Sequence, residues 1–81
     1  IEGVVVSARV VDGRGYLNFG AEYRNDFTVS IAPADRRLFE RAGLPIPSYQ
    51  GKRLRVRGWV ELLNGPMIEA THPEQIEMLA E

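Results

Sequence analysis

The chain has 81 residues, a formal net charge of -1 and a sequence pI near 5.8. This length allows one small domain, and this charge excludes the strongly basic class of nucleic-acid binders. The absence of cysteine excludes disulfides, thiolate nucleophiles and cysteine-ligated zinc. No apolar run reaches the roughly 18 residues of a membrane-spanning helix, so no membrane partner is expected.

The charge is spread unevenly along the chain. Residues 36–57 contain seven basic residues and one acid, Glu40, whereas residues 58–81 contain five acids and neither lysine nor arginine. The small net charge therefore combines a basic middle with an acidic tail. The simplest interpretation is that both segments form solvated surface.

The first predicted element is a long strand over residues 3–11. Its side chains are mostly β-branched, and the turn signal Asp12-Gly13 follows it directly. Because the apolar run is almost continuous, we expect this strand to be buried along much of both faces.

Two further strands are predicted over residues 16–20 and 27–31, with a connection between them. Strand periodicity places alternate side chains on opposite faces. Tyr16 and Asn18 then lie on the outward face of the second strand. The inward side chains are Leu17, Phe19, Phe27, Val29 and Ile31.

One helix is predicted over residues 33–43. Pro33 suits a first helical turn, Asp35 suits the positive helix N-terminus, and Gly43 suits the C-terminal cap. The apolar stripe of this helix consists of Leu38, Phe39 and Ala42. Residues 44–51 carry two prolines and predict a loop.

The clearest alternation in the chain predicts a fourth strand over residues 52–62. One parity holds Leu54, Val56, Gly58, Val60 and Leu62, and the other holds Arg53, Arg55, Arg57 and Trp59. The glycine at an inward position is typical of a bend in a barrel strand. A turn over 64–66, a fifth strand over 67–70, a helical turn over 72–75 and a short strand over 76–79 complete the chain.

This order predicts an all-β domain with one helix, formed by residues 1–81. An open five-stranded meander would leave unpaired edges, whereas closure into a barrel removes them. Three strands, one helix that plugs the barrel end and two strands form the order of the five-stranded OB-fold. Because the chain begins inside a strand-like run without methionine, we expect a domain excised from a longer protein.

The segments YLNFG, DFTVSI and GKRLRVRGWVELLNGPMIEATHPEQIEML carry a family resemblance. Over roughly residues 3–79 the chain resembles the OB-like module that follows the nuclease domain in bacterial thermonuclease-family (staphylococcal-nuclease-like) proteins. The resemblance implies an adjoining nuclease domain in a bacterial parent protein, which is exported if it is similar to the secreted thermonucleases. It places the catalytic and calcium-binding residues of that family outside this chain.

The outward residues of the fourth strand form the main candidate binding site. Three arginines on one strand face, spaced by about 7 Å, suit a phosphate track, and nearby aromatic rings can stack on bases. The predicted nucleic-acid-binding residues are Arg53, Arg55, Arg57, Trp59, Tyr16 and Asn18. The alternative is that these arginines form a solvated strand face and pair with Glu61, Glu69 or another acid.

Catalysis and metal binding receive no support from the residues. His72 is the only histidine, and the glutamates at 69, 74 and 77 follow no known cation-loop spacing. No serine has a base partner in a recognisable motif. We therefore expect no catalytic residue, metal or cofactor in this chain.

Two functions of different classes remain. The first is a noncatalytic module that binds single-stranded nucleic acid, or presents it to the adjoining nuclease domain. The second is a protein-interaction module that docks on that nuclease domain or forms a homodimer through Tyr16, Tyr23 and Trp59. A response of binding to salt separates them, because phosphate contacts release counterions and apolar contacts do not.

Overall fold

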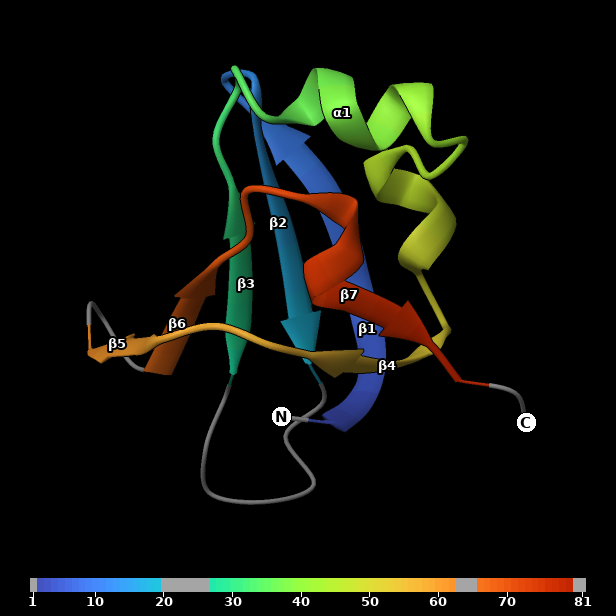
Figure 1. Cartoon of the computed structure of the whole chain (residues 1–81). Helices are drawn as coiled ribbons and strands as arrows, with labels where there is room; N and C mark the ends of the chain where they lie inside the picture. The colour runs from blue at the N-terminus through green and yellow to red at the C-terminus, as the bar shows by residue number, and fades with distance from the viewer. Residues whose placement is uncertain (1, 20–26, 63–65, 80–81) are drawn as a thin grey trace.

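The computed structural model describes residues 2–19, 27–62 and 66–79. The described residues form one sheet, one α-helix and two short 3-10 helices (Figure 1). The strands are β1 (Glu2–Val11), β2 (Arg14–Phe19), β3 (Thr28–Ile31), β4 (Arg53–Val56), β5 (Val60–Leu62), β6 (Pro66–Glu69) and β7 (Ile76–Met78). The helices are α1 (Arg36–Arg41), η1 (Ile46–Tyr49) and η2 (Pro73–Gln75).

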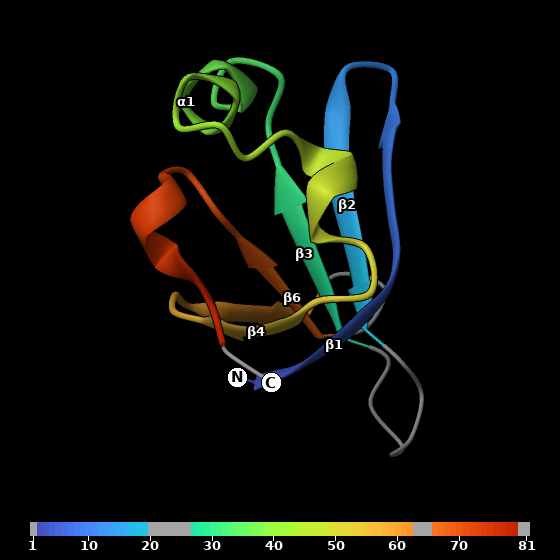
Figure 2. The ribbon, with the colours of Figure 1, turned by 90° about the vertical axis from the view of Figure 1, so that its right-hand side faces the viewer.

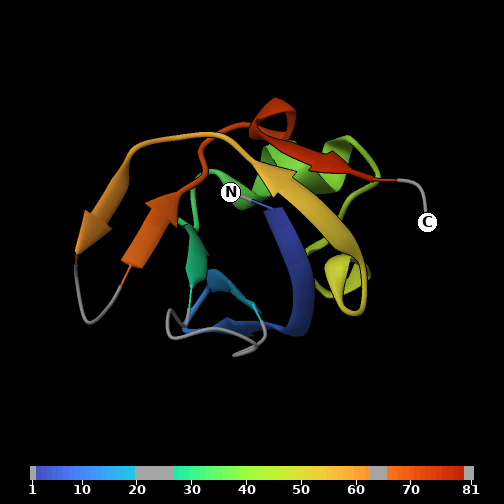
Figure 3. The same ribbon diagram turned by 90° about the horizontal axis from the view of Figure 1, so that it is seen from below.

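The sheet is curled and open, with the strand order β5-β6-β3-β2-β1-β4-β7 (Figures 1 and 3). All neighbouring strands are antiparallel except β3 and β6, which are parallel. The mainly β fold with one α-helix is confirmed. The prediction of a five-stranded closed barrel is wrong, because the described residues form seven strands and leave β5 and β7 at the two margins.

The extra strand arises where the predicted strand over 52–62 breaks into β4 and β5. Gly58 lies at the break with φ of +147°, a backbone conformation that residues other than glycine rarely adopt. On one side of the break β4 pairs with β1 and β7, and on the other β5 pairs with β6. The chain therefore joins the two ends of the sheet without a continuous strand.

The core lies on the concave side of the sheet. All inward side chains predicted for the second and third strands are buried, and so are Leu54 and Val56 of β4. Phe19 and Phe27 meet edge to face with ring centroids 5.9 Å apart. The alternation of the sequence therefore identifies this half of the core correctly, although Val60 and Leu62 continue the parity and are exposed.

The first strand is much less buried than predicted. Of its residues only Val5 and Ala8 are buried, and Val6 is 57% exposed. A bulge between Val5 and Ser7 shifts the register against β2, so the inward side chains change from odd to even numbers along β1. A continuous run of β-branched residues predicts the strand but does not reveal this shift.

The predicted helical plug is only partly correct. The α-helix is shorter than predicted and buries Phe39, whereas Leu38 is 38% exposed and Ala42 is exposed. The segment predicted as a loop instead contains η1, which contributes Ile46 and Tyr49 to the core. Figure 2 shows α1 across one end of the curled sheet and η1 beside β1 and β2.

The burial of Tyr49, which belongs to η1, makes the stability of the domain depend on pH. Its ring packs edge to face against Phe39, with centroids 6.5 Å apart. Its hydroxyl group is buried and makes no hydrogen bond with the described residues. Desolvation by burial raises the pKa of Tyr49 from 10.0 to about 12, because the phenolate anion would lose its hydration.

We expect the alkaline stability of the domain to depend on Tyr49. The folded state disfavours the phenolate, so this contribution to the free energy of unfolding is complete below pH 10 and is lost as the pH rises through about 12. Tyr49→Phe should leave stability at pH 7 unchanged and reduce this alkaline loss. Urea denaturation at pH 7 and pH 11 measures both, with Tyr16→Phe as the control. An equal loss of unfolding free energy between pH 7 and pH 11 in the wild type and in Tyr49→Phe would show that Tyr49 is not the source of the pH dependence.

We also expect Gly58 to be required for the break between β4 and β5. A Cβ atom added there would lie 2.7 Å from Cγ2 of Ile68, in addition to the strain of the positive φ. Such backbone strain costs about 1–3 kcal/mol. Gly51→Ala is the matched control, because Gly51 has φ of +79° but no atom within 4 Å of an added Cβ. Thermal denaturation should therefore show a larger loss for Gly58→Ala than for Gly51→Ala, and equal losses would refute the packing argument.

Candidate nucleic-acid interface

The arginines of β4 lie among carboxylates. Arg55 faces Glu2 of β1 and Glu77 of β7 in the strand register, at N–O distances of 3.4 Å and 3.7 Å. Arg53 lies 4.0 Å from the second carboxylate oxygen of Glu2. The acids come from neighbouring strands, as the alternative interpretation of the sequence expects, but they are not Glu61 or Glu69. The charge of this part of the predicted phosphate track is therefore partly compensated.

These ion pairs are weak. The side chains of Arg53, Arg55, Glu2 and Glu77 are each 45–50% exposed. Exposed pairs of this kind contribute about 0–1 kcal/mol, because water screens the charges and two long side chains must be ordered. A phosphate could exchange for a carboxylate here, but it would gain less than at an arginine with no acid beside it.

The outer residues of the predicted track, Arg57 and Trp59, lie at the break between β4 and β5. The backbone N–H of Arg57 donates to the carbonyl of Gln75 at 2.8 Å, and the side-chain amide of Gln75 donates to the carbonyl of Arg57 at 3.0 Å. Trp59 is 91% exposed. The four predicted residues thus do not form one uninterrupted strand face, because two lie on β4 and two lie where the strand is broken.

Tyr16 and Asn18 lie on the outer face of β2, as predicted. Leu17 and Phe19 alternate with them and are buried. Asn18 lies opposite Thr28 of β3, whose hydroxyl group donates to the Asn18 side-chain oxygen at 3.1 Å. One amide group of this face is therefore already oriented by its neighbour. Tyr23, by contrast, lies outside the described residues.

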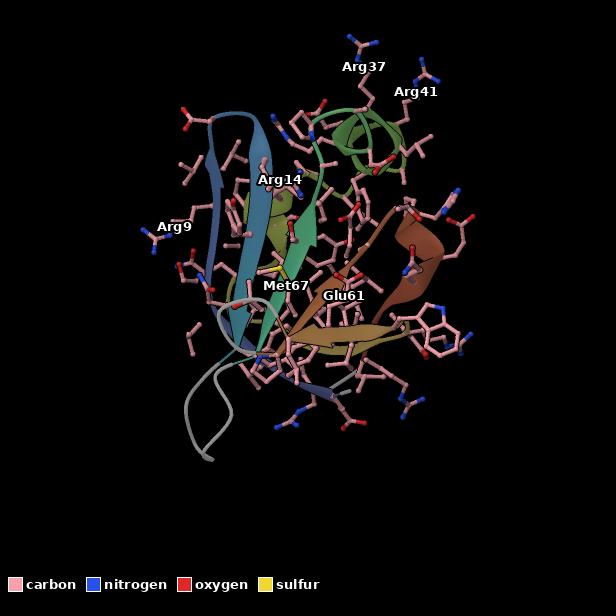
Figure 4. All side chains as sticks on the ribbon, turned by 90° about the vertical axis from the view of Figure 1, so that its left-hand side faces the viewer. Arg9, Arg14, Arg37, Arg41, Glu61 and Met67 are labelled. Atoms are coloured by element: carbon pink, nitrogen blue, oxygen red, sulfur yellow. The ribbon has the colours of Figure 1, made fainter. Side chains whose placement is uncertain are left out.

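Two arginines that the sequence prediction omitted flank Tyr16. Arg9 of β1 is its direct partner across the strands, and Arg14 precedes it by two residues on the same face of β2. Arg14 donates to the hydroxyl oxygen of the buried Ser30 at 2.9 Å. Figure 4 shows Arg9 at the margin of β1 and Arg14 over β2 and β3. Within the described ranges, neither arginine forms an ion pair.

We name the residues Arg9, Arg14, Tyr16 and Asn18 the Tyr16 face. Period-two alternation from Tyr16 back to Arg14 is the available sequence signal, but the second strand is predicted to begin only at Tyr16, whereas β2 begins at Arg14. Arg9 was hidden in a strand expected to be buried on both faces, and the register shift after Val5 turns it outward. The sequence analysis therefore misses Arg14 because the predicted strand starts too late, and it misses Arg9 because alternation within one strand does not reveal the bulge.

The same outer face becomes acidic toward β6 and β5. Ser30 of β3 pairs with Glu69 of β6, and Met67 of β6 pairs with Glu61 of β5. Figure 4 shows Met67 and Glu61 below Arg14 on this side of the molecule. A polyanion on this surface would therefore favour the β1–β2 half and be repelled from the β5–β6 half.

The two groups of predicted residues lie on different parts of the outer surface. In the sheet order β1 separates β2, which carries Tyr16 and Asn18, from β4, which carries Arg53 and Arg55. The register places Arg53 opposite Val4 and Tyr16 opposite Arg9. The structure therefore brings Tyr16 together with Arg9 and Arg14, and not with the arginines of β4.

His72, the only histidine, makes its hydrogen bonds with neighbouring residues at the start of η2. Nδ1 of His72 lies 2.9 Å from the hydroxyl oxygen of Thr71, and the His72 backbone N–H donates to the Gln75 side chain at 3.1 Å at the start of η2. In the part of the chain that the structure describes, no group of three or more histidine, aspartate or glutamate side chains is arranged to hold a metal ion.

None of the described helices is long and apolar enough to cross a membrane. The chain matches no protein-family model, no curated protein and no solved structure.

Proposed function

We propose that this chain is a noncatalytic OB-fold-like module that binds single-stranded nucleic acid on the Tyr16 face. The observation that carries the proposal is the position of Tyr16 between Arg9 and Arg14, which have no ion-pair partner in the described part of the chain. An aromatic residue flanked by two arginines on one sheet face combines the two contacts that single-strand binders use.

The strand connectivity supports an OB-fold-like assignment. Three antiparallel strands are followed by a helix, and β6 then returns parallel to β3. If β4 and β5 are taken as one fourth strand interrupted at Gly58, the order is that of the OB-fold. In that fold the second and third strands form the usual binding surface, which is where Tyr16 and Asn18 lie.

Each residue of the Tyr16 face has a separate role in this proposal. Arg9 and Arg14 bind phosphate through guanidinium forks, and Tyr16 stacks on a base, which contributes about 1–3 kcal/mol. Asn18 donates from its side-chain amide to a base edge or sugar, because its oxygen already accepts from Thr28. Glu61 and Glu69 keep the phosphate backbone over β1 and β2.

The context of the module is also a proposal. By its resemblance to the appended module of the thermonuclease family, the chain would adjoin a bacterial nuclease domain that contains the catalytic residues. The module would then hold a single strand near that domain without cutting it. The β4 arginines, compensated by Glu2 and Glu77, would contribute secondary phosphate contacts.

We expect weak, salt-sensitive binding of a fluorescein-labelled twelve-nucleotide oligothymidine by the domain. Tyr16→Ala should weaken binding by about fivefold to a hundredfold, the equivalent of one stacked base, with little change in the salt slope. Arg9→Ala should weaken binding and reduce the slope of log affinity against log salt by about 0.7. Fluorescence anisotropy at two salt concentrations measures all three effects.

Two variants are matched controls. Arg53→Ala removes the same charge as Arg9→Ala from an arginine that has Glu2 beside it, and Trp59→Ala removes an exposed aromatic ring from another surface. Both should affect binding less than their counterparts. Absence of binding at low salt would refute the function, whereas a greater effect of Arg53 and Trp59 would refute the Tyr16 face as its location.

A further inference from the structure

Strand β5 is an open margin of the sheet. Val60, Glu61 and Leu62 pair with Ile68, Met67 and Pro66 of β6, and β5 is the last strand in the sheet order. Within the described ranges, no backbone hydrogen bond occupies its other side. Figure 3 shows β5 at the outer limit of the ribbon, with β6 on its inner side. Its free N–H and C=O groups can accept a further strand.

This margin exposes large apolar side chains. Trp59 is 91% exposed, Leu62 is 81% exposed and Val60 is 50% exposed. Val60 pairs with Ile68, which is buried in the core, so the Val60 side chain lies on the core side of the sheet. The apolar face of the sheet therefore continues to β5 but is left without cover there. Natural proteins usually protect such a margin with charge, proline or a covering segment.

The outer side of the same margin is acidic. Glu61 alternates with Val60 and Leu62 along β5, and Glu69 lies on the outer side of the neighbouring strand β6. In the described part of the chain, neither carboxylate forms an ion pair. A complementary strand would thus present apolar side chains on one face and basic side chains on the other.

We propose that β5 binds an extended basic segment of a partner protein, in which lysine or arginine alternates with apolar residues. The segment pairs with the free side of β5, covers Val60 and Leu62, and places a cation beside Glu61. Trp59 packs over the end of the added strand. A second copy of this chain fits less well, because two-fold pairing centred on Glu61 would set two carboxylates opposite each other.

This inference does not depend on nucleic-acid binding. The residues that carry it lie on β5 and at the preceding break, whereas the Tyr16 face lies on β1 and β2. The two surfaces could serve one protein, with nucleic acid on one and a protein segment on the other. They are tested by different ligands and different variants.

The chain provides its own reporter, because Trp59 is its only tryptophan. The probe is an acetylated and amidated octapeptide of alternating lysine and valine, added to the domain while tryptophan emission is recorded. Binding should shift the emission to shorter wavelength in a saturable manner as Trp59 loses contact with water. A glutamate–valine octapeptide should give no shift, and neither should a lysine–valine peptide with N-methyl groups on its pairing edge.

Variants locate the effect. Glu61→Lys should weaken peptide binding at least tenfold, whereas Glu74→Lys, the same change at an exposed acid of η2, should not. Circular dichroism of each variant checks that the fold is retained, and Val60→Thr provides a milder change on the same strand. The proposal is wrong if the lysine–valine peptide gives no shift at 1 mM (on the order of the weakest specific affinities) or if the glutamate–valine peptide binds equally. It is also wrong if the domain alone forms dimers by sedimentation with Trp59 buried.

Discussion

The break at Gly58 is the constraint on which the sheet architecture and the open margin at β5 depend. Without it, one strand would run from β4 into β5 with a regular alternation of arginines and apolar residues. The positive φ of Gly58 and its close approach to Ile68 end this alternation. Gln75 holds the adjoining residue, Arg57, by hydrogen bonds to its N–H and carbonyl groups. As a result, β4 pairs with β7 at one side of the curled sheet, β5 pairs with β6 at the other, and the outer side of β5 is left uncovered.

The distribution of charge then decides which outer surface suits a polyanion. On β4 the guanidinium group of Arg55 lies between two carboxylates, so its positive charge is partly used within the domain. On β1 and β2, Arg9 lies opposite Tyr16 and Arg14 precedes Tyr16 by two residues, and neither arginine has such compensation in the described residues. A count of arginines along the sequence favours β4, whereas the pairing of strands favours the Tyr16 face.

Local periodicity predicts what depends on neighbouring residues in the chain. It identifies the inward faces of β2, β3 and β4 and the outward position of Tyr16, because alternation is a property of each strand alone. It does not predict the bulge of β1, the carboxylates that face Arg55, or the burial of Tyr49. Each of these depends on contacts between different segments of the chain, which the alternation within one strand does not report. The closed barrel is predicted because an open five-stranded sheet would leave unpaired edges, and Gly58 is expected only to bend the fourth strand. In the structure the strand breaks at Gly58 instead, and β5 and β7 remain at the margins of an open sheet.

Nuclear magnetic resonance offers the most direct test of the central claim, that Arg9, Arg14, Tyr16 and Asn18 form the nucleic-acid interface. A ¹⁵N-labelled sample of the domain would be titrated with unlabelled oligothymidine while the backbone amide shifts are followed residue by residue. The account predicts that the largest shifts cluster on β1 and β2 around Tyr16 and remain small on β4. Shifts concentrated on Arg53, Arg55 and the break at Gly58, or no shifts at any residue, would contradict it.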